Sequence, residues 1–269
     1  MKVHHFAKLP FALTVLILLL AFAAGAQEKK EIRYVVGRNP IVSITNKFGP
    51  VTVMPSENRQ VVVGTTSHSN RIQLVNEQRG NRIEVRADAS DRGSALAEYT
   101  VQVPSDAFVI LRSSNGTLRA AGLRGDLVVD SVSSSVEVSD ITDAHVHVRT
   151  LSGPVTLTGI RNSHVGVRSV SGNVDIHNVA GASLKVNSGR GRITYDGHPG
   201  ASGEYLLTSH SGDLDVSIPA NAAVEITARS LTFTIPPTRD KNLLMKPGIV
   251  NASRFVLRSV RGKIHLKRP

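Results

Sequence analysis

Apolar residues stand at every second position in short runs along most of this chain, and the runs return at a nearly constant interval. Four clear copies share a turn containing Ser and Gly, followed by an alternating apolar stretch: TLSGPVTL (150–157), SVSGNVDI (169–176), SHSGDLDV (209–216) and SVRGKIHL (259–266). Alternation with period two predicts short β-strands. Its return every 18 to 21 residues predicts a structural repeat whose copies must stack on one another to bury their apolar faces.

The copies align on one position of the turn, which we call the slot. The slots are Gly49, Gly116, Ser134, Gly153, Gly172, Gly191, Gly212, Leu231 and Gly262. Apolar pairs follow at positions 2 and 4 after the slot and again near positions 12 and 14, and positions 7 and 17 complete six expected inward side chains. This pattern predicts an all-β, single-domain β-solenoid, similar to a parallel β-helix, with rungs of about 19 residues and two short strands per rung.

Glycine in the slot has a backbone interpretation. A sharp turn often requires a positive φ, which costs a residue with a Cβ about 1–2 kcal/mol and which glycine adopts freely. We therefore expect positive φ at Gly172 and at the other slot glycines. Where Ser134 or Leu231 fills the slot, we expect a changed turn geometry or register.

The regularity of the repeat divides the chain into three parts. Residues 1–26 read as a signal peptide, residues 27–106 as a less regular N-terminal β region with one early rung at Gly49, and residues 107–269 as the solenoid repeats. Within the second part, residues 71–87 fit either another rung or an antiparallel hairpin around Gly80-Asn81. Within the third, prolines and a glycine mark a loop excursion at 236–249.

The N-terminal segment predicts export. Lysines flank its charged end, a 13-residue apolar run covers 11–23, and Ala24-Gly25-Ala26 forms a cleavage pattern before Gln27. The apolar run is too short to span a bilayer, which takes about 20 residues. No later segment is a candidate span, so we expect a mature protein in the periplasm or at the cell surface.

Composition narrows the chemistry. The chain contains no Cys and no Trp, which excludes disulfides, thiolate nucleophiles and Cys-based zinc sites. From Gln27 onward, 30 Lys and Arg face 21 Asp and Glu, a formal charge of +9. Such a surplus favours polyanions, so we expect an anionic envelope polymer or another surface protein as partner, although basic residues also keep a long sheet soluble. Nucleic acid is not expected, because no recognition module is present.

Four outward arginines recur at equivalent positions of the rungs and form a broken basic ladder. They are the candidate contacts to a polyanion: Arg112, Arg149, Arg168 and Arg258. Their alternative role is to keep the surface soluble.

Other polar residues offer weaker chemistry. His145, His147 and His164 would lie on adjacent rungs, but no acidic residue is expected in the corresponding outward positions, so we expect no metal site. Asp175, Asp213 and Asp215 face outward near turns, yet a glycan cleft normally also needs aromatic platforms. We therefore expect no catalytic residue and no cofactor.

The set of motifs resembles the DUF4097 family of proposed adhesins. The resemblance rests on the I-x-N-x-x-G-x-V-x-V element from Ile44 to Val53, the V-P-S segment at 103–105 and the serial S-G-x-V turns, and it covers most of residues 40–268. It implies a β-repeat domain at the bacterial cell envelope, a label of adhesin given by analogy, and no catalytic or ligand residues. The sequence departs from the pattern at Ser134 and Leu231.

Three functions are compatible with the sequence. The leading expectation is a non-enzymatic envelope binding or adhesin-like module. The first alternative is a structural or regulatory part of an envelope assembly that docks a partner through the ends of the ladder or the 236–249 loop. The second is a polysaccharide-active β-helix enzyme.

Overall fold

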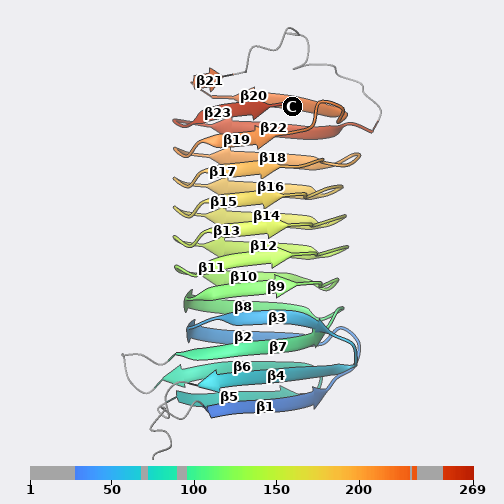
Figure 1. The fold of residues 1–269 in the computed structure, drawn as a ribbon, viewed down its shortest axis with the longest axis vertical. Coiled ribbons are helices and arrows are strands. Elements are labelled where there is room, and N and C mark those ends of the chain that lie inside the picture. Colours follow the sequence, from blue (N-terminus) through green and yellow to red (C-terminus); the bar gives the residue numbers. More distant parts are fainter. Residues whose placement is uncertain (1–27, 68–71, 90–95, 231, 235–250) are drawn as a thin grey trace, which may run out of the picture.

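The protein is a column of stacked β-strands in two facing sheets, as the computed structural model in Figure 1 shows. The structure describes residues 28–67, 72–89, 96–230, 232–234 and 251–269, and none of these is helical. The all-β solenoid expected from the repeat is therefore confirmed. The expected signal peptide at 1–26, the slot residue Leu231 and the loop at 236–249 lie outside the described residues.

From β7 onward, the two sheets take alternate strands of the chain. In spatial order, the 12-stranded sheet contains β1 (Glu28–Val35), β4 (Gln60–Ser67), β7 (Ala97–Pro104), β3 (Val51–Ser56), β9 (Thr117–Ala121), β11 (Ser135–Ser139), β13 (Val155–Thr158), β15 (Val174–His177), β17 (Ile193–Asp196), β19 (Leu214–Ser217), β23 (Lys263–Lys267) and β21 (Thr232–Thr234). The 11-stranded sheet contains β20 (Val224–Arg229), β22 (Ser253–Ser259), β18 (Glu204–Ser209), β16 (Ser183–Ser188), β14 (His164–Ser169), β12 (His145–Thr150), β10 (Leu127–Ser131), β8 (Phe108–Asn115), β2 (Ile41–Phe48), β6 (Arg82–Ala89) and β5 (Ile72–Arg79).

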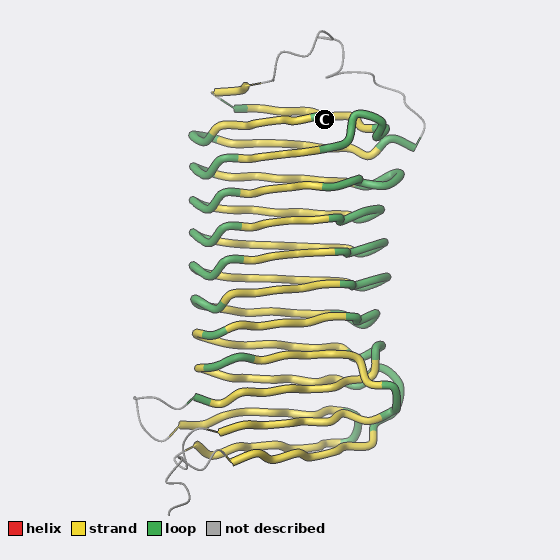
Figure 2. Tube along the Cα trace, in the orientation of Figure 1, coloured by secondary structure: helices red, strands yellow, loops and turns green. Residues whose placement is uncertain are grey.

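Each regular rung contributes one strand to each sheet, and neighbouring rungs pair in parallel and in register. In the 11-stranded sheet Val146 pairs with Val165, and Val165 with Leu184. The turns at both edges lie above one another (Figure 2). Equivalent positions of successive rungs therefore form straight columns of side chains along the solenoid.

The interior is filled from five of the six expected inward positions. In the rung that follows Gly153, the side chains at positions 2, 4, 7, 12 and 14 are all at most 3% exposed. The prediction that position 17 faces inward is wrong, because Leu151 and Val170 are 52% and 54% exposed. The alternation that starts at positions 12 and 14 reaches position 16 on the inside, so position 17 must face outward. Position 16 holds buried Ser or Thr, such as Ser169, whose hydroxyl donates to the Gly172 carbonyl at 2.7 Å.

The explanation expected for the slot glycines is also largely wrong. Gly49 and Gly116 have positive φ, but Gly172 and the other later slot glycines do not. Instead, a Cβ on Gly172 would lie 2.0 Å from the carbonyl oxygen of Gly153 on the rung before it. Glycine is required in these slots because backbone stacks directly on backbone. Ser134 occupies its slot without a change of register, since Val136 still pairs with both Leu118 and Val155.

Positive φ occurs at the opposite turn. There Gly, Asn and Asp alternate from rung to rung, with φ of 55° at Asp140, 66° at Gly159 and 53° at Asn178. Asn and Asp tolerate the left-handed region better than other residues with a Cβ. The two edges of the solenoid therefore use glycine for different reasons.

The last rung is not stacked in chain order. Strand β22 lies between β18 and β20, and β23 lies between β19 and β21. A Cβ on Gly262 would lie 2.1 Å from the Gly212 carbonyl oxygen. Only glycine fits against Gly212 at this distance, so the C-terminal rung takes this place, and strands β20 and β21 lie at the end of the column.

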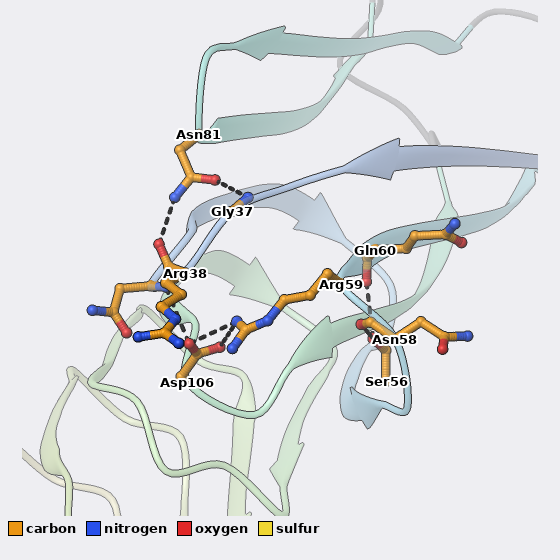
Figure 3. A network of polar contacts seen from close by, with 9 residues as sticks. Gly37, Arg38, Ser56, Asn58, Arg59, Gln60, Asn81 and Asp106 are labelled. Atoms are coloured by element: carbon orange, nitrogen blue, oxygen red, sulfur yellow. Dashed lines mark hydrogen bonds and ion pairs between the residues drawn. The ribbon is translucent and has the colours of Figure 1, made fainter.

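The N-terminal end closes with antiparallel strands. Of the two structures that the sequence left open here, a further rung or a hairpin, residues 72–89 form the hairpin: β5 and β6 pair antiparallel, and Gly80 has a φ of 59°. The early rung β2 and β3 stacks on β8 and β9. In Figure 3, Arg59 holds the Asp106 carboxylate with two hydrogen bonds of 2.7 Å, and Asn81 accepts from Gly37. Burial raises the pKa of Asp106, but the hydrogen bonds from Arg59 and the Asn39 amide outweigh it, and the net pKa is lowered.

Candidate functional site

The four predicted arginines all lie in one column on the outer face of the 11-stranded sheet. From β6 to β20 the column reads Arg86, Thr45, Arg112, Asp130, Arg149, Arg168, Asn187, Thr208, Arg258 and Arg229. The structure brings Arg149 and Arg168 next to each other. It does not bring Arg112 or Arg258 to them, because Asp130 intervenes on one side and Asn187 and Thr208 on the other.

The carboxylate of Asp130 lies close to two of the arginines, Arg112 and Arg149. Its carboxylate oxygens lie 3.8 Å from Arg112 Nε and 3.8 Å from Arg149 Nη1. Exposed pairs of this kind contribute at most about 1 kcal/mol. The sequence reasoning missed Asp130, although it stands four residues before its slot, like all four arginines.

Arg149 and Arg168 line a hollow of about 210 Å³ on strands β12, β14 and β16, midway along the column (Figure 1). Beside them lies a second column, His147, Gly166 and Lys185, whose members pair across the same three strands. Gly166 has no side chain, and a Cβ there would lie 2.9 Å from His147 Nδ1. The missing side chain opens the hollow, and Asn187 lines it as well. We call this site the basic hollow.

No acidic side chain lines the basic hollow. Elsewhere on the solenoid, cations on one rung face acids on the next: Arg119 lies 2.8 Å from Glu137, and Arg192 lies 3.3 Å from Asp215. Within the described part of the chain, Arg168 and Lys185 have no ion pair. Like charges on directly adjacent strands destabilise a sheet. An anion in the hollow would relieve that repulsion and accept hydrogen bonds from guanidinium groups.

Two of the three histidines considered for a metal site, His145 and His164, form a stack. The imidazole rings of His145 and His164 lie parallel, with centroids 5.0 Å apart. The expectation that no acid occupies a corresponding position was wrong, because Asp126 Oδ1 lies 3.1 Å from His145 Nδ1 on the preceding rung. In the ranges that the structure describes, no group of three His, Cys, Asp or Glu could hold a metal ion.

Two of the three aspartates considered for catalysis serve as counter-ions on the 12-stranded sheet. Arg192 lies 3.9 Å from Asp213 and 3.3 Å from Asp215. Asp213 also accepts a hydrogen bond from the Lys263 amide at 2.8 Å. These contacts join neighbouring rungs.

The fold and the repeated turn define a class of β-repeat protein. A model of the family described as Toastrack DUF4097 matches residues 41–246, and the chain belongs to that family. No curated protein matches the chain. Among the described residues, none forms a helix long and apolar enough to cross a membrane.

Several solved structures are similar to this chain. A proposed cell adhesion protein from Clostridium sporogenes has 13% identity and a TM-score of 0.33, with 90% of this chain and 100% of the other covered. A proposed lipid-binding protein from Parabacteroides distasonis has 12% identity and a TM-score of 0.44, covering 90% and 97%. A proposed adhesin from Bacteroides fragilis has 12% identity and a TM-score of 0.41, covering 90% and 98%.

Proposed function

We propose that this protein is an exported, non-enzymatic binding module of the cell envelope that holds an anionic envelope polymer through the basic hollow. The observation that carries the proposal is the cluster of Arg149, Arg168 and Lys185 around Gly166, with no acid among the lining residues. The signal-peptide pattern at 1–26 and the adhesin label of similar proteins agree with it.

The site is suited to binding through several weak contacts. Arg149 is 68% exposed at its side chain, so each ion pair with a ligand is screened by salt and worth little by itself. Parallel strands place the side chains of neighbouring rungs about 4.8 Å apart. A polymer with repeated carboxylates, sulfates or phosphates can contact Arg149, Arg168 and Lys185 together, and the contacts add up within one molecule.

Retention on immobilised heparin and polygalacturonate, with neutral dextran as the reference, tests the proposal. The variant Arg149→Glu/Arg168→Glu should bind both acidic polymers at least about tenfold more weakly at low salt, because two attractive contacts become repulsive. The control Arg161→Glu/Lys263→Glu makes the same change in net charge at exposed residues away from the hollow. It should lose far less affinity.

Two results contradict the proposal. Equal losses in the two variants would mean that net charge, and not the hollow, sets the affinity. Unchanged binding by the folded Arg149→Glu/Arg168→Glu variant would place the binding surface elsewhere. Circular dichroism of each variant establishes that it is folded.

A further inference from the structure

A ladder of exposed aliphatic side chains lies directly beside the column of arginines. Val132, Leu151 and Val170 stand on three consecutive rungs and are 49%, 52% and 54% exposed. Each follows a residue of the arginine column by two positions. Backbone hydrogen bonds keep the turns aligned: the Ser152 amide donates to the Val132 carbonyl, and the Ser171 amide to the Leu151 carbonyl, both at 2.9 Å.

The apolar ladder and the arginines share surface depressions. One hollow of about 340 Å³ is lined by Arg149 and Arg168 together with Leu151 and Val170. A second, of about 310 Å³, is lined by Arg112 and Val132, among others. The basic hollow, which also contains Arg149 and Arg168, continues this surface toward Lys185. Aliphatic groups and cations therefore belong to one continuous strip across several rungs.

The composition of this strip distinguishes between classes of anionic ligand. A hydrophilic polyanion would use the arginines and leave the aliphatic ladder in water. A turn kept only for solubility has no use for Val or Leu at an exposed position, and the same position holds glycine at Gly189. Cations on long, flexible stems beside exposed aliphatic groups are typical of surfaces that lie at a membrane interface.

We propose that this strip docks on an anionic lipid surface. Arg149, Arg168 and Lys185 bind the phosphate headgroups, while Val132, Leu151 and Val170 enter the boundary between headgroups and acyl chains. The inference rests on the proposed anion-binding function of the basic hollow and goes beyond it, because it adds an anionic lipid surface to the anionic polymer as a ligand of the same site.

Binding to lipid vesicles and to heparin, measured side by side, tests the inference. Wild-type protein should co-sediment with phosphatidylglycerol–phosphatidylcholine vesicles but not with phosphatidylcholine alone. Leu151→Ser/Val170→Ser should weaken vesicle binding at least about tenfold and leave heparin retention unchanged, since burial of the aliphatic groups is lost and no charge changes. The control Val35→Ser/Met54→Ser alters two exposed apolar residues of the 12-stranded sheet and should bind vesicles like wild type.

A direct measurement of insertion uses the absence of tryptophan from the chain. The single tryptophan of Leu151→Trp should shift its emission to shorter wavelength on phosphatidylglycerol vesicles. That of Arg161→Trp, at the opposite turn, should not shift.

The outcomes separate this inference from the proposed function. Heparin binding without vesicle binding by the wild type would overturn the lipid inference and leave the polymer function standing. So would full vesicle binding by folded Leu151→Ser/Val170→Ser, or an emission of Leu151→Trp that does not shift. Binding to neither probe by the wild type would overturn both.

Discussion

At the scale of single residues, glycine has two separate functions in this solenoid. Gly172 is required by close contact, because a Cβ there would lie 2.0 Å from the Gly153 carbonyl oxygen of the preceding rung. Gly159, at the opposite turn, is favoured by its φ of 66°. Asn178 occupies the equivalent position on the next rung with a φ of 53°, so a side chain fits there.

The same substitution at both glycines should separate the two functions. Gly172→Asn should lower the free energy of unfolding by at least about 3 kcal/mol, at the upper end of overpacking costs, because backbone must move. Gly159→Asn should cost less than about 1 kcal/mol, since asparagine tolerates positive φ and the nearest atom to its Cβ is the movable Asp140 carboxylate oxygen. Urea unfolding measures both. Similar costs at the two sites would contradict the close-contact explanation.

The buried hydroxyl of Tyr205 makes the stability of the fold depend on pH. Tyr205 packs against Phe255, with ring centroids 4.3 Å apart, and its hydroxyl donates to the Pro199 carbonyl oxygen at 2.6 Å, while the Val179 carbonyl oxygen lies 3.1 Å from the same hydroxyl oxygen. Burial raises its pKa to about 12. A raised pKa gives stability that is complete below the unfolded value of 10 and is lost as the pH rises toward 12.

Thermal unfolding between pH 9 and 12 should therefore show a steep loss of stability, of up to about 1.4 kcal/mol per pH unit from this one group. Tyr205→Phe should be less stable than wild type at pH 8, because the Pro199 carbonyl loses its donor. Its stability should fall less steeply above pH 10. If the stability of the two proteins fell with pH at the same rate, the pKa of Tyr205 would not be raised in the folded state.

At the scale of elements, in-register pairing of strands turns residues four positions before the slot into a column with its own electrostatics. In the order Arg112, Asp130, Arg149, Arg168, the carboxylate of Asp130 partly neutralises the first part of this segment, while the part with Arg168 stays basic. The affinity of the basic hollow for anions thus depends on Asp130, which lies on the strand next to β12 but does not line the hollow.

Removal of this carboxylate should strengthen anion binding. Asp130→Asn frees Arg149 and should increase affinity for heparin about threefold, in line with the energy of an exposed ion pair. Asp175→Asn makes the same charge change on the 12-stranded sheet and should have a smaller effect. Salt titration of retention compares the two. A larger gain at Asp175 would indicate a binding surface on the other sheet.

At the scale of the whole molecule, stability comes from contacts between neighbouring rungs, so the column should tolerate a change in the number of rungs. Deletion of 154–172 removes one full period and joins Gly153 to Asn173. Strand β12 would then pair with β16 in the same register. The shortened protein loses Gly166 and Arg168, and with them the centre of the basic hollow.

The deletion variant should keep a β-type far-ultraviolet circular dichroism spectrum and melt at a lower temperature, while its heparin retention falls. Deletion of 154–162, which is not a full period, should abolish folding because it places polar residues on the inside. A folded protein after the partial deletion, or an unfolded one after the full deletion, would contradict a register set by the rung.

The sequence by itself determined the class of fold and most of the positions that fill the interior. The period of about 19 residues, the positions of the paired strands and five of the six inward positions of a rung can be read from the alternation, because burial in a strand follows the order of the chain locally. The equivalence of Arg112, Arg149, Arg168 and Arg258 follows from the same alignment.

The tertiary structure decided what depends on contact between rungs. Only stacking shows that Gly172 is needed because the backbones of two rungs approach each other closely. It also shows that β22 lies between β18 and β20, and that Asp130 separates Arg112 from Arg149. The basic hollow was likewise beyond sequence reasoning, because it arises from a side chain that Gly166 lacks between cations on three different strands. Alternation along one strand reports which side a residue faces, whereas contact between strands decides which neighbours it meets there.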